Sequence, residues 1–276
     1  MDESVVAAIL AGGAGRRMGG NKPAARLPDG QSLLAAVAQT AGQVAGVVWR
    51  IGGPAGDIGP DDARHMRHVP DLRPGLGPVA GIEAAARAML DGLTPRPRPG
   101  ASGPPAPDPS TRGLPTPGPP SIVRPEPLLL VLPCDMPDLP AAWLQALIQA
   151  ARAAGGRPHQ LVVEDALDPG GTAPRDAVRA AAGEFGVAPS PSSSPPRSSF
   201  PLPLVGAPAR IAAAAEQQLD ADDRRLQQLI RALDTAAVRV PARAMPWLRN
   251  VNDNAARLGP RPGLGDVPAI SESDVP

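Results

Sequence analysis

The sequence predicts an α/β protein with a single, doubly wound and mostly parallel sheet. Short apolar runs alternate along the 276 residues with segments whose apolar positions recur at helical spacing. This is the pattern of strands joined by crossover helices. Several runs are apolar at consecutive positions rather than at alternate ones, as strands buried on both faces require. In sheets of this type, ligands bind beyond the carboxyl ends of the strands.

The first half of the chain supplies two predicted strands and two predicted helices. The run VVAAIL at residues 5–10 is a strand that ends at a glycine-rich loop. A helix follows from Ser32, whose hydroxyl can cap it, through Val44. VVWRI at residues 47–51 is the second strand. Pro78 marks the start of the second helix, because proline fits the first helical position, where no amide donor is needed.

The second half continues the alternation. LLLVL at residues 128–132 is the most apolar predicted strand of the chain, and Pro140 opens the helix that follows it. Periodicity and turn residues then predict a strand at 160–164, a helix at 222–233, a strand at 237–240 and a helix that begins after Asn252. The loops at residues 11–22, 70–78 and 133–139 should lie together at the carboxyl ends of the strands.

Two stretches rich in proline and serine interrupt this pattern, at residues 95–127 and 168–203. Proline fixes φ and lacks an amide donor, and scarce apolar side chains leave little surface to bury. We expect both stretches to be disordered insertions in a single domain that spans residues 1–276, and residues 260–276 to be a flexible tail. Polyproline segments that bind partner proteins are the alternative for the insertions.

Composition and charge exclude several functional classes. The chain has 27 Lys and Arg against 27 Asp and Glu, so a zero net charge argues against a nucleic-acid or membrane partner. Aromatic residues make up 2%, too few for base-stacking platforms, and the single cysteine rules out a disulfide framework. The start MDES lacks the basic segment of a secretory signal, and no apolar run reaches the roughly 18 residues of a membrane span. We expect a cytoplasmic protein whose three histidines lie on the surface.

The glycine-rich loop LAGGAGRRMGGNK at residues 10–22 carries two arginines and Lys22. Glycines let backbone amides approach a polyphosphate closely, and the three cations lie within seven residues, which favours a triphosphate ligand. The spacing fits neither a P-loop nor a dinucleotide fingerprint, because Pro23 follows Lys22 and no helix opens directly behind the glycines. A surface turn with solvated arginines is the alternative.

Asp135 lies in VLPCDMPDLP, just past the most apolar strand and on a turn framed by prolines. A carboxylate presented there is a hard oxygen ligand for Mg²⁺. A helix-capping role is the alternative. Cys134 beside it has no histidine in a comparable motif, so we expect a buried, small apolar residue.

Asp71 lies in VPDLRPGLGPVAGI, just before a glycine-rich helix start that favours anions. Its carboxylate could accept hydrogen bonds from a nucleobase edge or a ribose hydroxyl. An ordinary turn aspartate is the alternative. The segment DDRRL at residues 222–226 could contact a phosphate or simply be a solvated helix start.

The string LAGG-x-x-R-R-M-G-G-x-K resembles the signature loop of nucleotidyltransferases of the sugar-nucleotide and cofactor class. It is most similar to that of the molybdenum cofactor guanylyltransferases, the A proteins of molybdopterin-guanine dinucleotide biosynthesis. PCDMP at residues 133–137 matches their P-C-D-x-P motif, and RNVNDNAARL at residues 249–258 loosely matches N-V-N-T-P. Asn21 stands where that family usually has Asp, and its His-Pro motif is missing. The resemblance covers residues 5–90 and 128–154 well and residues 202–258 loosely.

The resemblance implies a Rossmann-like α/β fold and the transfer of GMP from GTP to molybdenum-bound molybdopterin, with Mg²⁺ as cofactor and pyrophosphate as product. GTP and molybdopterin would be the small-molecule partners, and molybdoenzymes or cofactor-insertion proteins the protein partners. It implies that the nucleotide is bound by Leu10, Ala11, Gly12, Gly13, Lys22, Asp71 and Asp135. Lys22, Arg17 and Asp135 would be the catalytic residues, with Asp135 holding the metal. Asn250 and Asn252 would contact a metal-bound water or a phosphate, and a helix cap is the alternative for Asn252.

Three other functions stay open. A cytidylyltransferase that acts on the same cofactor shares the loop, although the LAGG form and the GG before the lysine favour guanine. A sugar-1-phosphate nucleotidyltransferase is usually longer and has different motifs in its second half. A non-catalytic nucleotide-binding scaffold would use the proline-rich insertions to recruit partners.

Overall fold

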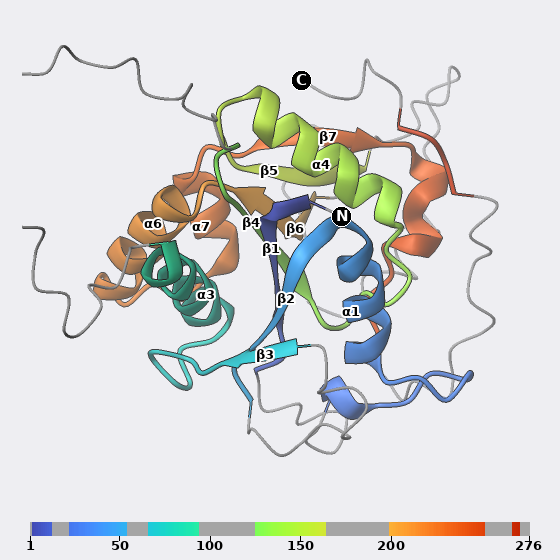
Figure 1. Cartoon of the computed structure of the whole chain (residues 1–276), viewed down its shortest axis with the longest axis horizontal. Coiled ribbons are helices and arrows are strands. Elements are labelled where there is room, and N and C mark those ends of the chain that lie inside the picture. Colours follow the sequence, from blue (N-terminus) through green and yellow to red (C-terminus); the bar gives the residue numbers. More distant parts are fainter. Residues whose placement is uncertain are drawn as a thin grey trace, which may run out of the picture.

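The sheet has seven strands in the order β3-β2-β1-β4-β6-β5-β7, in a computed structural model that describes residues 2–12, 22–53, 66–93, 125–163, 199–251 and 267–270 (Figure 1). The strands are β1 (Asp2–Leu10), β2 (Ala45–Ile51), β3 (Met66–Val69), β4 (Leu128–Pro133), β5 (His159–Val163), β6 (Ser199–Gly206) and β7 (Ala236–Val240). β6 is antiparallel to both of its neighbours, and the other described pairings are parallel. The predicted α/β fold with one mostly parallel sheet is therefore confirmed.

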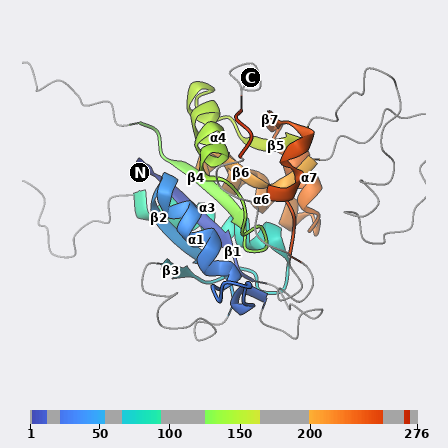
Figure 2. The ribbon, with the colours of Figure 1, turned by 90° about the vertical axis from the view of Figure 1, so that its right-hand side faces the viewer.

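Helices cover both faces of this sheet. The α-helices are α1 (Leu33–Val44), α3 (Pro78–Leu93), α4 (Ala141–Ala153), α6 (Pro208–Asp220) and α7 (Leu226–Ala232), and η2 (Lys22–Ala24) and η3 (Ala242–Trp247) are 3₁₀ turns. Helices α1 and α4 lie on the face that is turned towards the viewer in Figure 2, whereas α3, α6 and α7 lie on the other face. No helix in the described residues is long and apolar enough to cross a membrane.

Two apolar cores, one on each face, hold these layers together. The side chains of β4 alternate between them: Leu128, Leu130 and Leu132 pack with α1 and α4, and Leu129 and Val131 pack with α3 and α6. All five are almost completely buried, and burying one leucine side chain stabilises a fold by about 1.5–3 kcal/mol. The consecutive apolar pattern of this segment thus reflects a strand that is covered on both faces.

Local chemistry sets several element boundaries. Ser32 accepts a hydrogen bond from the Ala35 amide and so caps α1 as predicted. The predicted helix start at residue 222 is wrong, because α6 ends in a turn there. Asp222 has a φ of +55°, and the amides of Asp222 and Asp223 donate to the carbonyls of Leu219 and Gln218. Because α6 terminates in this left-handed turn, α7 begins only at Leu226.

The structure also corrects the bounds of two segments that were expected to be disordered. β6 begins at Ser199, so the second insertion ends before residue 203. Residues 267–270 pack on the core rather than forming part of a free tail, since the indole of Trp143 donates to the Pro268 carbonyl at 2.9 Å. The helix expected after Asn252 lies outside the described residues.

The strand directions place the loops at two opposite edges of the sheet. The carboxyl ends of β1, β2, β3 and β4 share one edge, where Leu10 is in register with Ile51 on one side and Pro133 on the other. Helix α3 then leads back to the opposite edge, where β4 begins at Leu128. Among the described residues, Lys22, Asp71 and Asp135 belong to segments that follow strands at this carboxyl edge.

Candidate functional site

Lys22 and Asp135 form an ion pair at the carboxyl edge of the sheet. Lys22 Nζ donates to Asp135 Oδ2 at 2.7 Å, and the two side chains are 21% and 20% exposed. Lys22 begins the turn η2, which is fixed to α1 by a hydrogen bond from the Leu33 amide to the Ala25 carbonyl. The ammonium group and the carboxylate are therefore held together in a place that water reaches only partly.

The C-terminal segment supports the turn that carries Asp135. The Val251 amide donates to the Asp135 carbonyl at 2.8 Å. Beside it, Arg249 Nε donates at 2.9 Å to Asp138 Oδ2, and the Asp138 side chain is only 2% exposed. Val251 is itself buried against Leu27 on the Lys22 side of the site. Residues 249–251 thus connect the lysine segment to the aspartate turn.

Asp71 lies on the other side of β1, after β3. A Cβ atom on Gly52 would be 2.7 Å from Asp71 Oδ2, and one on Gly12 would be 3.2 Å from the same oxygen. The carboxylate therefore occupies space that any other residue at these two positions would fill. Burial raises the pKa of Asp71, and the charge of His68 opposes this effect.

The two aspartates consequently flank the end of β1 and the start of the glycine-rich loop. Asp71 contacts Gly12 on the β2 side, and Asp135 follows β4 on the opposite side. The prediction that the three loops meet at one edge is confirmed for these residues.

Comparison with known protein families identifies the family of this chain. The profile of the MobA-like NTP transferase domain matches residues 7–238. The chain belongs to the MobA-like NTP transferase family. No curated protein matches the sequence significantly.

Solved structures of low sequence identity share the fold of this NTP transferase. Molybdopterin-guanine dinucleotide biosynthesis protein A from Archaeoglobus fulgidus is 17% identical with a TM-score of 0.50, over 91% of this chain and 94% of its own. The 4-diphosphocytidyl-2C-methyl-D-erythritol synthase from Anaerococcus prevotii is 14% identical with a TM-score of 0.53, over 91% of both chains. At these identities the likeness establishes the fold alone.

The described residues offer a metal ion only a few protein ligands. No group of three or more His, Cys, Asp and Glu side chains suited to a metal occurs in the described ranges. Asp135 Oδ1, however, accepts no hydrogen bond from the residues that the structure describes. Mg²⁺ often takes one or two carboxylates and completes its shell with water and substrate phosphates. The site therefore fits an ion that arrives with a nucleotide.

The predicted site residues do not all fall in the described part of the chain. Gly13, Arg17 and Asn252 lie outside it. Asn250 is exposed and is adjacent to the Arg249–Asp138 pair. β1 ends at Leu10, and the amide of the next residue, Ala11, donates to the Ile51 carbonyl at 2.9 Å, which fixes the backbone just before Gly12.

Cys134 is buried, and burial raises the pKa of its thiol to about 12. A thiol that stays protonated at neutral pH is a poor nucleophile, which agrees with the structural role expected for this residue.

Two of the histidines are not surface residues, contrary to expectation. His159 is almost fully buried, its Nδ1 lies 2.7 Å from the Arg157 carbonyl, and burial lowers its pKa. His68 is half-buried, with Nε2 lying 3.2 Å from the Gly53 carbonyl. His65 lies outside the described residues.

In the DDRRL segment each arginine binds a neighbouring carboxylate. Arg224 pairs with Asp222 at 2.8 Å, and Arg225 pairs with Asp223 at 2.6 Å. Hydrogen bonds from Arg225 lower the pKa of Asp223 to about 2. These local pairs favour the solvated-turn interpretation of the segment.

The supporting residues Asp138 and Arg249 were not predicted from the sequence. Asp138 lies between two prolines in the same motif as Asp135, which was a usable signal. Nothing local marks Arg249, because its partner is 111 residues away.

Proposed function

We propose that this NTP transferase transfers GMP from GTP to molybdenum-bound molybdopterin, with pyrophosphate as the second product. The observation that carries the proposal is the ion pair between Lys22 and Asp135, which joins the glycine-rich loop segment to the PCDMP turn. The preference for guanine rests on the sequence of the glycine-rich loop. The loop begins with LAGG and has two glycines shortly before Lys22, and both features favour guanine over cytosine.

In the proposed reaction, a phosphate oxygen of the acceptor attacks the α-phosphorus of GTP. The bond between that oxygen and phosphorus forms, the bond to the bridging oxygen of pyrophosphate breaks, and the electron pair leaves with pyrophosphate. Negative charge grows on the leaving group, so cations that are already in place lower the barrier. Lys22 would provide such a cation, because Asp135 holds its ammonium group before the substrate binds.

Asp135 would also hold Mg²⁺ through the oxygen that Lys22 does not occupy. When bound, Mg²⁺ supplies positive charge to the phosphate oxygens. Arg17, which precedes Lys22 in the loop, is proposed to approach the phosphates as well.

Asp71 would recognise the nucleoside end of GTP. Its carboxylate accepts no hydrogen bond from the described residues, and Gly12 and Gly52 leave room only for the carboxylate itself. An N–H group of the base or a ribose hydroxyl could donate to it. Leu10, Ala11, Gly12 and Gly13 would line the same nucleotide.

The acceptor side is proposed to involve Asn250 and Asn252. Asn250 is exposed beside the segment that supports Asp135, so its amide is accessible from the carboxyl edge. The protein partners would be molybdoenzymes or cofactor-insertion proteins. We place the enzyme in the cytoplasm, where Cys134 would stay a thiol.

Pyrophosphate release tests this proposal directly. The purified protein would be incubated with Mg²⁺, molybdenum-bound molybdopterin and, in turn, GTP, CTP, ATP and UTP. Of the four nucleotides, we expect only GTP to give rapid release of pyrophosphate. Release with CTP instead would replace the proposed guanylyltransferase with a cytidylyltransferase. Nucleotide binding without release for all four would favour a scaffold.

A further inference from the structure

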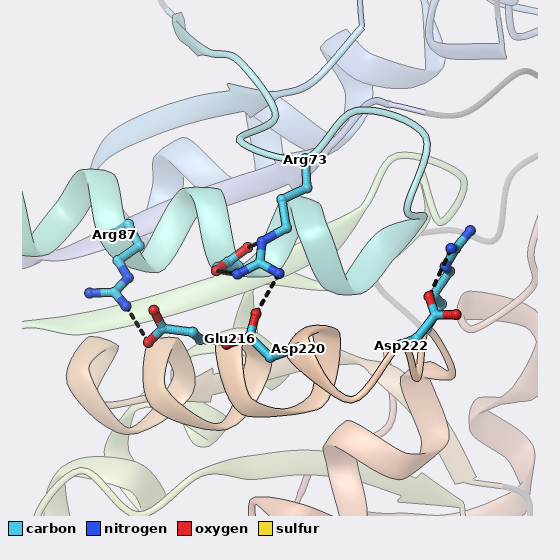
Figure 3. A network of polar contacts seen from close by, with 7 residues as sticks. Arg73, Arg87, Glu216, Asp220 and Asp222 are labelled. Atoms are coloured by element: carbon cyan, nitrogen blue, oxygen red, sulfur yellow. Dashed lines mark hydrogen bonds and ion pairs between the residues drawn. The ribbon is translucent and has the colours of Figure 1, made fainter.

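Arg73 connects the loop that carries Asp71 to two helices. It lies in the segment 70–77, between β3 and α3. Its guanidinium group contacts Glu83 on α3, with Nη2 3.3 Å from Oε1 and Nε 3.1 Å from Oε2. Nη1 donates at 2.7 Å to Asp220 Oδ1 at the end of α6. Figure 3 shows Arg73 reaching from this loop across α3 to Asp220.

Glu83 makes this contact a fixed point of the fold. Its side chain is only 4% exposed, and Arg73 is the only cation that pairs with it among the described residues. A buried carboxylate without a cation is costly, so the guanidinium group is held where Glu83 lies. Arg73 Nη2 donates a hydrogen bond to Oε1, whereas Nε lies within ion-pair distance of Oε2 without donating a hydrogen bond to it.

The Asp71 side chain, by contrast, forms no hydrogen bond or ion pair with the residues that the structure describes. Its carboxylate is confined instead by the close approach of Gly12, Gly52 and Gly81. The loop that carries it contains Gly75 and Gly77, both with φ of +83°, and glycine adds no side chain that could fix the backbone. The position of Asp71 therefore depends on an anchor elsewhere in the loop.

We propose that Arg73 is a positioning residue, which fixes the loop 70–77 to α3 and α6 and thereby holds the Asp71 carboxylate where the nucleotide binds. This inference rests on the part of the proposed function that assigns nucleotide contact to Asp71. Arg73 itself does not touch the nucleotide. It acts through the loop backbone that connects it to Asp71, two residues earlier in the sequence.

A second ion pair provides a matched control. Arg87 on α3 pairs with Glu216 on α6, so it joins the same two helices as Arg73 does. The side chains of Arg87 and Glu216 are 40% and 42% exposed, and Arg87 forms no ion pair with loop 70–77 in the described structure. Figure 3 shows the pair of Arg87 and Glu216 between the same two helices as Arg73 and Asp220, further along the helix axes. Loss of helix–helix pairing alone would affect both arginines, whereas loss of loop anchoring would affect only Arg73.

The experiment measures the affinity for GTP by calorimetry, with CTP titrated in parallel, on the full chain and its variants. We expect Arg73→Met to weaken binding by roughly tenfold while kcat changes by less than about twofold, because an anchor of a binding residue alters KM rather than chemistry. Arg73→Lys should recover part of the affinity, since it keeps the charge but not the fork. Arg87→Met should bind like the unmodified protein.

A double-mutant cycle separates positioning from direct contact. Asp71→Asn should weaken binding, and adding Arg73→Met to it should cause no further loss, because the two residues act through one carboxylate. Additive losses would overturn the inference. Normal binding by Asp71→Asn would instead overturn the assignment of Asp71 in the proposed function.

Arg73→Met leaves the Glu83 carboxylate buried without its partner, so this variant could unfold. The double variant Arg73→Met/Glu83→Gln removes both charges and avoids that penalty. Urea unfolding would establish that it is folded at the temperature of the assay. Unchanged GTP affinity in the folded double variant, or an equal loss in Arg87→Met, would overturn the inference.

Discussion

Lys22 Nζ lies 2.7 Å from Asp135 Oδ2, although 113 residues separate the two in the sequence. Each belongs to a different motif, the glycine-rich loop and the PCDMP turn, and each follows a strand of the parallel part of the sheet. Strands β1 and β4 are neighbours, so their ends deliver both motifs to one place. The two motifs, which are far apart in the sequence, therefore form one charged site.

Replacing either member of this pair should cost most of the activity. We expect Lys22→Ala and Asp135→Ala each to lower kcat by about 10²–10³, as the loss of one preorganised electrostatic group does. The double variant should be little worse than either single one, because residues that act as a unit are not additive. Steady-state pyrophosphate release measures all three.

A neighbouring cation gives the control for this prediction. Arg26 is exposed and donates to the Gly30 carbonyl, away from Asp135. Arg26→Ala should therefore keep nearly full turnover. Near-normal rates in both Lys22→Ala and Asp135→Ala would refute their catalytic assignment.

Gly52 should be needed for nucleotide binding, for a reason distinct from backbone strain. Its φ is +69°, and an added Cβ would lie 2.7 Å from Asp71 Oδ2. Gly52→Ala should therefore displace the carboxylate and weaken GTP affinity, besides the roughly 1–2 kcal/mol that a left-handed alanine costs. Gly30 has a φ of +84° and open space around it, so Gly30→Ala carries the strain without the clash.

Calorimetric titration of both alanine variants, with urea unfolding in parallel, separates the two effects. Gly52→Ala should lose at least as much stability as Gly30→Ala, and only Gly52→Ala should lose GTP affinity. Equal affinities in the two variants would show that the space beside Asp71 is not required for binding.

Local chemistry in the sequence was sufficient to predict most of the fold. The cap at Ser32 and the apolar run of β4 act within a few residues, so each was visible before the structure was known. β6 was missed because Pro201 and Pro203 argue against a strand interior. These prolines lie where the pairing with β5 is irregular, between the register positions of Leu204 and Ser199.

The site was predictable only where its residues belong to compact motifs. Lys22, Asp71 and Asp135 each follow a strand within a recognisable string, so their convergence followed from the topology. Arg73 and Arg249 are tied to partners on other elements, and no local pattern marks a contact of that kind. The short strand β3, with charged Arg67 at its centre, was likewise recognisable only by its pairing with β2.

Asp71 should make stability depend on pH in the opposite direction to an ordinary paired aspartate. Burial raises the pKa of this carboxyl above the value of 3.8 for a free side chain, so the folded state binds the proton more tightly than the unfolded state does. Stability should fall as the pH rises from 3.8 through the raised pKa and then stay constant.

Asp71→Asn removes this titration while keeping the shape of the side chain. The variant should be more stable than the unmodified protein at pH 7, and the difference should shrink as the pH falls through the raised pKa towards 3.8. Urea unfolding of both proteins between about pH 3 and pH 8 measures it. A difference in stability that is independent of pH would contradict the prediction.

The two proline-rich stretches should differ in their importance for catalysis, because their described flanks lie at opposite edges of the sheet. Residues 95–124 connect the end of α3 to the start of β4, at the edge away from Lys22 and Asp135. Residues 168–198 connect the end of β5 to the start of β6, and β6 is antiparallel to β5, so both flanks lie at the carboxyl edge.

Replacing residues 95–124 with a short Gly/Ser linker should leave kcat and KM within about twofold. The fold should tolerate this change, because the entropy cost of closing a loop changes only slowly with its length. The same replacement of residues 168–198 should raise the KM for the acceptor, because the strand ends that flank the segment lie at the carboxyl edge. Steady-state kinetics of the two deletion variants, at saturating GTP and varied acceptor, compares them directly. A larger loss in the first variant than in the second would mean that distance from the carboxyl edge does not govern the contribution of these segments.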